Sequence, residues 1–133
     1  MEFVSIRIVT ADVSRLARFY ERITGIAPRR YTDDFVEIET RRAVIAIAHE
    51  RTMAMFADGA ARPASNRSVI LELRVEDVDA TYARLAPELA EVLQPPTTMP
   101  WGNRSLLFRD PDGNLVNFFQ PRSEAARARF ERA

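Results

Sequence analysis

The sequence predicts an α+β protein built from two βαβββ modules. One observation is a pattern that occurs twice: a run of alternating apolar and polar residues, an aspartate, and then an amphipathic helical stripe. The second is that three short β-prone runs follow each copy of this pattern. Because one helix covers only one face of its sheet, we expect the modules to pair into a curved mixed sheet, a cup with the helices outside.

The first module spans residues 1–49. Residues 3–9 alternate as a half-buried strand does, and Asp12 is predicted to cap a helix. Apolar residues then recur at helical spacing until Gly25, which is predicted to end the helix. Three β-prone runs follow, around residues 29–31, 35–39 and 43–49.

The second module spans residues 68–121 and repeats this plan. Residues 71–75 alternate, Asp77 is the predicted helix cap, and an apolar stripe continues to Pro87. The β-prone runs of this module lie around residues 91–93, 105–109 and 115–119. The repeat therefore predicts two modules of the same topology within one domain.

Two further segments lie outside the modules. Residues 50–67 have weak periodicity and a tail rich in small and turn-forming residues, so they are predicted to be a linker. Met53, Met55 and Phe56 form an apolar cluster there, which we interpret as an interface or a lid. Residues 122–133 are predicted to form a short, arginine-rich, solvated C-terminal helix.

Composition excludes several classes of function. The chain of 133 residues has no cysteine and no lysine, which excludes thiolate ligands, Schiff-base lysines and a phosphate-loop lysine. Nineteen basic residues are balanced by nineteen acidic ones, and the arginines are scattered, so we expect no nucleic-acid partner. No apolar run is long enough to span a membrane, and the absence of cysteine favours a cytoplasmic location.

Alternation assigns a set of polar side chains to the cup. Ser5 and Arg7 in the first module and Glu72 and Arg74 in the second are predicted to point away from the helices. Arg7 and Glu72 occupy equivalent places in the repeat. We expect an ion pair between them, which holds the modules in register, orients a ligand, or does both.

Asn117 is a lone amide among apolar residues, in a strand that follows the Asp-Pro-Asp-Gly turn of residues 110–113. Its parity places it in the cup together with Phe119. We favour a pocket-lining role for Asn117, although a satisfied core amide is the alternative. His49 shares the parity of Ile45 and Ile47, near a strand end, so we interpret it as structural or exposed.

Three segments together resemble the vicinal oxygen chelate superfamily, which comprises glyoxalases, bleomycin resistance proteins and extradiol dioxygenases. They are IRIVTADVSRLARFYERITG (6–25), LELRVEDVDATYARL (71–85) and PWGNRSLLFRDPDGNLVNFFQP (100–121). Metal-dependent members hold an ion with one side chain from each of four strands. The resemblance places these ligands at Ser5, Ala46, Ile70 and Asn117. Such a set lacks anionic and imidazole donors, so we expect the metal site to be lost and no cofactor to be bound.

The resemblance also places Trp101, in a proline-rich loop, at the rim of the cup, where it would stack on a planar ligand. The alternative is a loop anchor packed on the domain's own surface. The predicted ligand-binding residues are Ser5, Arg7, Glu72, Arg74, Trp101, Asn117 and Phe119.

These expectations favour a metal-free small-molecule-binding protein of the glyoxalase/bleomycin-resistance type. It would hold a small organic ligand in the cup and form a homodimer, with the modules paired within a chain or exchanged between chains. The alternative is a lyase, isomerase or dioxygenase of the superfamily, either with Glu72 as a base or with metal ligands elsewhere. A scaffold or regulatory domain with a vestigial cup is a third possibility. The acidic and imidazole side chains considered for the metal are Glu37, Glu39, Glu50, Glu72 and His49.

Overall fold

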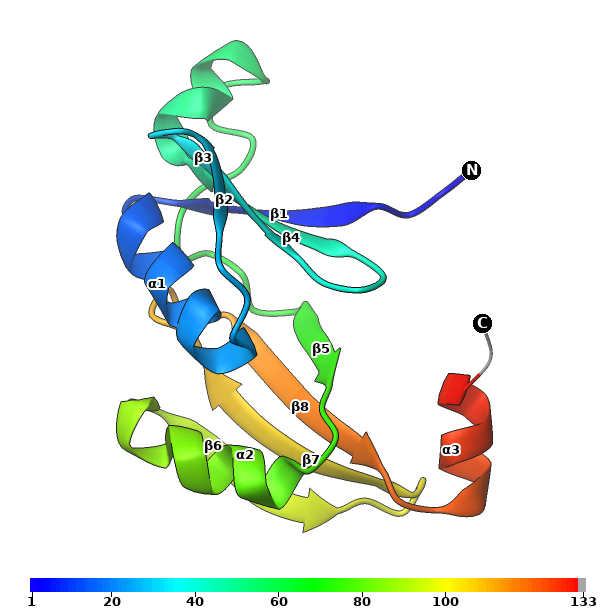
Figure 1. The fold of residues 1–133 in the computed structure, drawn as a ribbon. Helices are drawn as coiled ribbons and strands as arrows, with labels where there is room; N and C mark the ends of the chain where they lie inside the picture. The colour runs from blue at the N-terminus through cyan, green and yellow to red at the C-terminus, as the bar shows by residue number, and fades with distance from the viewer. Residues whose placement is uncertain (132–133) are drawn as a thin grey trace. The chain divides into compact units, whose positions relative to one another are not determined.

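The computed structural model describes residues 1–131 and divides into two compact units, Met1–Ser65 and Asn66–Ala133. Each unit is a four-stranded mixed sheet with one helix between its first two strands (Figure 1). The strand orders are β1-β4-β3-β2 and β5-β8-β7-β6, with the first strand of each unit parallel to its last. The predicted α+β class and both βαβββ modules are confirmed, whereas the pairing of the two sheets into one cup stays a prediction.

The elements follow the predicted order. The first unit contains β1 (Ser5–Thr10), α1 (Val13–Thr24), β2 (Arg29–Thr32), β3 (Phe35–Glu39), β4 (Val44–His49) and the 3-10 helix η1 (Glu50–Met55). The second contains β5 (Ile70–Arg74), α2 (Val78–Leu85), the 3-10 helix η2 (Ala86–Glu88), β6 (Val92–Thr98), β7 (Asn103–Arg109), β8 (Leu115–Pro121) and α3 (Glu124–Glu131).

Both predicted helix caps are present. The Asp12 carboxylate accepts a hydrogen bond from the Arg15 N–H at 3.0 Å, and Asp77 does the same for Ala80. α1 ends at Gly25, whose φ of 72° is left-handed and whose N–H donates to the Glu21 carbonyl. α2 is shorter, because Pro87 follows within a turn and the chain continues as η2.

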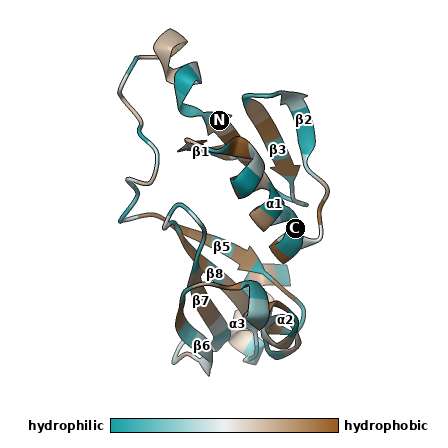
Figure 2. Ribbon diagram, turned by 90° about the vertical axis from the view of Figure 1, so that its left-hand side faces the viewer, coloured by the Kyte–Doolittle hydropathy of each residue, from teal (hydrophilic) through white to brown (hydrophobic). Residues whose placement is uncertain are grey.

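The core of each unit lies between its helix and one face of its sheet. α1 contacts β3 and β4, and α2 contacts β6, β7 and β8. Figure 2 shows β3 as largely hydrophobic, whereas the edge strand β2 is hydrophilic, in line with the exposure of all its residues. In the second unit Phe108 and Phe118 meet edge to face with ring centroids 5.1 Å apart. The buried apolar side chains of the strands include Val36, Ile38, Ile45, Ile47, Leu106, Phe108, Val116 and Phe118.

Three segments differ from the sequence expectation. β6 runs through Pro95 and Pro96 to Thr98, because an edge strand with register shifts tolerates residues that lack an N–H donor. The start of the expected linker forms η1, in which Met53 is buried. α3 occupies Glu124–Glu131, and residues 132–133 of the expected C-terminal helix lie outside the described residues. Of the helices that the structure describes, none has the length and apolar character needed to cross a membrane.

Candidate functional site

In each unit, the face of the sheet that is turned away from α1 or α2 carries most of the candidate residues. We call it the far face. In the second unit, strand pairing places Glu72, Asn117 and Leu107 side by side across β5, β8 and β7. The next row along the strands consists of Arg74, Phe119 and Ser105. The alternation predicted from the sequence therefore brings Glu72, Arg74, Asn117 and Phe119 together.

The Asp-Pro-Asp-Gly turn fixes the position of Asn117. Asp110 Oδ1 accepts hydrogen bonds from the backbone N–H groups of Asp112 and Asn114, each at 2.9 Å. Asp110 Oδ2 accepts from the Asn114 side chain at 2.8 Å, and Gly113 supplies the left-handed φ of 83°. This turn sets the register of β7 against β8, and the register places the Asn117 amide on the far face.

Asn117 and Glu72 are hydrogen-bonded. Asn117 Nδ2 donates to Glu72 Oε2 at 2.8 Å. An ionised carboxylate only accepts hydrogen bonds, so the amide must turn its NH₂ group toward Glu72. Asn117 Oδ1 consequently points elsewhere, and within the described residues this buried oxygen has no hydrogen-bond partner. A buried acceptor without a partner destabilises a protein by roughly 1–3 kcal/mol. A hydrogen-bond donor placed at Asn117 Oδ1 would remove this cost.

α3 reaches the same face. The ring of Phe130 lies 4.9 Å from the ring of Phe119, and Arg74 Nη1 donates to the Phe130 carbonyl at 3.1 Å. Phe119 points to the far face because its neighbour Phe118 points to the core. The C-terminal helix is therefore not simply a solvated surface piece, since its last turn packs beside the candidate site.

Trp101 lies at an exposed position in the loop between β6 and β7, with 62% of its surface accessible. The loop is closed by a hydrogen bond from the Gly102 N–H to the Met99 carbonyl at 2.9 Å. The Gly102 carbonyl accepts from the N–H groups of Arg122 and Ser123, just before α3. The backbone of this loop is therefore tied to α3, while the stacking role of the indole stays a prediction.

The first unit arranges its far face differently. Arg7, Ala46 and Glu37 lie side by side across β1, β4 and β3. The Arg7 guanidinium lies 5.2 Å from the ring centroid of Phe35 and 5.6 Å from that of Phe56. These contacts are cation–π interactions. Ser5 is half-buried on the same face. Arg7 and Glu72 belong to different units, so the ion pair expected between them stays a prediction.

An aromatic and acidic cluster extends from Phe35 to the sheet edge. Tyr31 lies 5.8 Å from Phe35 between ring centroids, and Arg29 lies 5.5 Å from the Tyr31 ring. A hydrogen bond to the Glu37 carboxylate raises the pKa of Tyr31 above its ordinary value, because it favours the protonated phenol. Arg29 also pairs with Glu39 at 3.3 Å.

The other side chains considered for metal binding have structural partners or exposed positions. His49 Nδ1 accepts from the Arg51 N–H at 3.1 Å and caps η1, as its structural interpretation suggests. Glu50 is the exposed first residue of η1. Among the residues that the structure describes, no group of three or more histidine, cysteine, aspartate or glutamate side chains could hold a metal ion.

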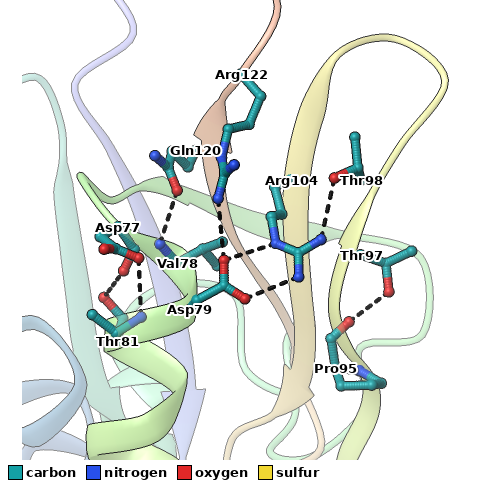
Figure 3. A network of polar contacts seen from close by, with 11 residues as sticks. Asp77, Val78, Asp79, Thr81, Pro95, Thr97, Thr98, Arg104, Gln120 and Arg122 are labelled. Atoms are coloured by element: carbon teal, nitrogen blue, oxygen red, sulfur yellow. Dashed lines mark hydrogen bonds and ion pairs between the residues drawn. The ribbon is translucent and has the colours of Figure 1, made fainter.

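The most extended polar network joins α2 to the sheet (Figure 3). Arg104 binds Asp79 with two hydrogen bonds of 2.8 and 2.9 Å, and Arg122 adds a contact of 3.2 Å. The Arg104 hydrogen bonds hold the pKa of Asp79 below its ordinary value, and the same contact raises the pKa of Arg104. Every side chain in this network has a protein partner, so we interpret it as structural.

Comparison with known proteins identifies the family. A family model described as Glyoxalase/Bleomycin resistance protein/Dioxygenase superfamily matches residues 2–118. The chain belongs to this superfamily. Its most specific sequence segment, the Asp-Pro-Asp-Gly turn with the following strand, is the element that positions Asn117 in the structure.

Individual proteins resemble this superfamily member in sequence or in fold. The curated protein YraH of Bacillus subtilis (strain 168) is 25% identical over 127 residues, which cover 90% of this chain and 98% of that protein. A protein of unknown function from Agrobacterium tumefaciens str. C58 is 27% identical with a TM-score of 0.78, covering 90% of this chain and 94% of that chain. A glyoxalase/bleomycin resistance protein/dioxygenase family enzyme from Burkholderia phytofirmans PsJN has a TM-score of 0.79 at 16% identity. The match covers 91% of this chain and 99% of that chain. The last likeness shows the fold alone.

The superfamily implies a metal, and the residues at the expected ligand positions do not fit one. Asn117 directs its NH₂ group to Glu72, Ala46 is a buried methyl group, and Ile70 is a half-exposed hydrocarbon. Ser5 adds one neutral hydroxyl. Divalent metals in proteins are held by carboxylate, imidazole or thiolate groups, and these four positions supply none of them.

Sequence reasoning missed three aromatic residues near the candidate site. Phe35 and Phe56 flank Arg7, although Phe56 was assigned only to the apolar cluster of the linker. The Phe130 ring lies tilted against the ring of Phe119. Phe35 was detectable, because its alternation with Val36 assigns it to the far face. Phe56 follows the short 3-10 helix η1, and Phe130 lies within the weakly amphipathic helix α3, so periodicity does not indicate where either side chain points.

Proposed function

We propose that this superfamily member is a metal-free small-molecule-binding protein that holds a small organic ligand against the far faces of its sheets. The observation that carries the proposal is the Asn117–Glu72 pair. It puts an amide where the resemblance places a metal donor, and the buried oxygen of this amide has no partner among the residues that the structure describes. Aromatic rings beside a few fixed polar groups are the usual composition of small-molecule sites.

Several residues have stated roles in this proposal. Glu72 and Asn117 supply polar contacts, and Phe119 supplies an apolar platform next to them. Arg7 is held by two rings in the first unit, and the exposed indole of Trp101 is available to stack on a planar ligand. Ser5 and Arg74 complete the set of proposed ligand contacts. Binding by sequestration requires affinity alone, so no proton or group transfer is assigned.

Nuclear magnetic resonance with chelator-treated protein tests this function. A library of small aromatic compounds is screened for changes in the chemical shifts of the backbone and side-chain amides of β8. The fluorescence emission of Trp101 is then measured with each compound that binds. We expect ligands that shift the Asn117 signals and bind equally well before and after chelation. Binding that requires an added divalent metal, or that shifts only residues outside the far faces, would overturn the proposal.

One observation favours a catalytic alternative. The Glu72 carboxylate is exposed on the far face, where it could act as a general base in a lyase or isomerase. A panel of glutathione–methylglyoxal and catechol assays distinguishes this alternative from binding. Turnover that disappears in Glu72→Gln would establish an enzyme, and turnover that depends on added metal would instead restore a dioxygenase or glyoxalase assignment.

We also propose that the chain forms a homodimer. Phe3, Met55 and Phe56 of the first unit are large apolar side chains that remain exposed. Apolar residues of this size on a surface commonly mark a contact with another chain. Light scattering of the purified chain should give twice the mass of one chain, and a monomer over the micromolar range would refute the dimer.

A further inference from the structure

We propose that the second unit selects ligands that donate a hydrogen bond, such as amides, amidines and protonated amines, over ligands that only accept. This inference rests on the proposed binding function and specifies the chemical class of the ligand. It is derived from the direction in which the Asn117 amide points.

The first step concerns the orientation of the amide. The two ends of an asparagine side chain have similar shapes, so their assignment depends on hydrogen-bond partners. Here the partner is the Glu72 carboxylate, 2.8 Å from Asn117 Nδ2. The reversed amide would bring two acceptor oxygens together at that distance, which is unfavourable. Glu72 therefore sets the direction of Asn117.

The second step concerns the oxygen left over. Asn117 retains 9% of its surface, and its Oδ1 is buried without a partner in the described part of the chain. This oxygen accepts hydrogen bonds and has none to donate. Because this oxygen is buried, a ligand contacts it only when the side chains that cover it move aside. An N–H or O–H group placed there removes an existing penalty, whereas a carboxylate or ketone oxygen would meet a second acceptor.

The charges on the same face support this selection. Glu72 adds a negative charge on the Nδ2 side of the Asn117 amide. Two arginines occupy the far face nearby, and each already donates to a backbone carbonyl: Arg74 to Phe130 at 3.1 Å and Arg109 to Gly113 at 2.9 Å. Arg109 also lies 3.8 Å from Glu91. These contacts engage each guanidinium without removing its charge, so the preference for a donor over an oxyanion rests on the Asn117 oxygen and the Glu72 carboxylate.

Benzamide, acetophenone and benzoate form a matched set for the test, since all three present a planar group of similar size on one ring. Benzamide donates and is neutral, acetophenone only accepts and is neutral, and benzoate only accepts and is anionic. Affinities are measured by titration of isotope-labelled protein at millimolar compound concentration. The Asn117 side-chain NH₂ signals, assigned by their loss in Asn117→Leu, serve as the local probe.

We expect benzamide to bind about tenfold more tightly than acetophenone, with benzoate the weakest of the three. The neutral pair separates donation from charge. Asn117→Leu should abolish the advantage of benzamide over acetophenone. Glu72→Gln should reduce it, because a glutamine amide can donate to Asn117 Oδ1 and permits the reversed orientation. Glu88→Gln, which removes an exposed acid from η2, is the charge control and should retain the wild-type order.

Equal binding of benzamide and acetophenone, or tighter binding of benzoate, would refute the donor selection while leaving a ligand site in place. Equal binding is also the result expected if a water molecule permanently satisfies Asn117 Oδ1. Failure of all three compounds to perturb the far face of the second unit would refute the proposed binding function there as well. The two proposals are thus overturned by different results.

Discussion

β1 and β5 begin the two units in the same way, but they place opposite charges on the far face. Arg7 lies beside Ala46, and Glu72 lies beside Asn117, at equivalent points of the two parallel strand pairs. On the opposite face the buried strand residues are mostly apolar, and α1 packs against β3 and β4 as α2 packs against β6, β7 and β8. The two units therefore share the apolar pattern of the face turned toward the helix, whereas their far-face residues differ in charge and size.

The helices show a second difference. Asp12 and Asp77 cap α1 and α2 alike, but two residues later the first unit has Ser14 and the second has Asp79. Asp79 binds Arg104 and Arg122, so α2 is joined to its sheet by charges as well as by apolar packing. α1 instead buries five apolar residues over a longer helix. The unit with the shorter helix therefore carries the larger ionic network.

Removing equivalent core residues should have the largest effect. Ile47 of β4 pairs with Ile8, and Phe118 of β8 pairs with Leu73. The side chains of Ile47 and Phe118 are fully buried. Phe118→Ala should lower the free energy of unfolding by roughly 3–5 kcal/mol and Ile47→Ala by roughly 2–5 kcal/mol, because each leaves a cavity. Urea denaturation measures both. A loss below about 1 kcal/mol at either position would contradict the equivalence of the two cores.

Two glycines with left-handed φ should differ when each gains a methyl group. Gly25 has open space around its position, so Gly25→Ala should cost about 1 kcal/mol from backbone strain alone. At Gly102 a Cβ would lie 2.0 Å from Ser123 Oγ, so Gly102→Ala should cost roughly 2–4 kcal/mol. Thermal and urea unfolding give the comparison. Equal losses would show that the loop and α3 are not in close contact.

Leucine substitutions at the two equivalent far-face positions, Ala46 and Asn117, should change the stability of the protein in opposite directions. Ala46 is buried, so Ala46→Leu should destabilise the protein by roughly 1–3 kcal/mol through overpacking. Asn117→Leu removes a buried oxygen that has no partner within residues 1–131, so it should stabilise the ligand-free protein by about 1 kcal/mol while weakening ligand binding. Denaturation in the absence of ligand measures both variants. Destabilisation by Asn117→Leu would assign the amide to the structural core.

Replacing Asp79 with serine, the residue at the equivalent position of α1, should have the smallest effect on stability. This effect should depend on pH. Contact with Arg104 lowers the pKa of Asp79 from 3.8, so its contribution to stability is complete above that pH. The contribution disappears as the pH falls through the lower pKa of the folded state. Asp79→Ser should thus reduce stability slightly at neutral pH and flatten the acid limb of the stability profile. Identical acid limbs for both proteins would argue against the network.

Local patterns allowed the helix caps, the module order and the direction of most far-face side chains to be predicted. Asp12, Gly25 and Asp77 have local roles that a few neighbouring residues define. The hydrogen bond between Asn117 and Glu72 was not predictable in this way, because it depends on the register of two strands far apart in the sequence. The symmetry of the repeat predicts Arg7 as the partner of Glu72, and that ion pair stays a prediction.

The remaining differences have similar causes. β6 extends through Pro95 and Pro96 because its place at the sheet edge, a tertiary property, removes the need for every N–H. α3 is rich in arginine and weakly amphipathic, so its sequence pattern does not indicate which face packs, and its position depends on a few specific contacts. One of these contacts, between Phe130 and Phe119, joins residues whose proximity depends on the turn between β8 and α3.

The attachment of α3 has a consequence for kinetics. α3 is held to its unit by the Phe119–Phe130 contact, by the Arg74 hydrogen bond and by the Gly102 carbonyl. Detaching this helix breaks few contacts and leaves the sheet intact, so its opening should require less free energy than global unfolding. Amide hydrogens of α3 should therefore exchange with solvent faster than those of β8. A ligand could then reach Phe119 only as fast as α3 opens. The association rate of such a ligand would be limited by the opening of this helix and not by diffusion.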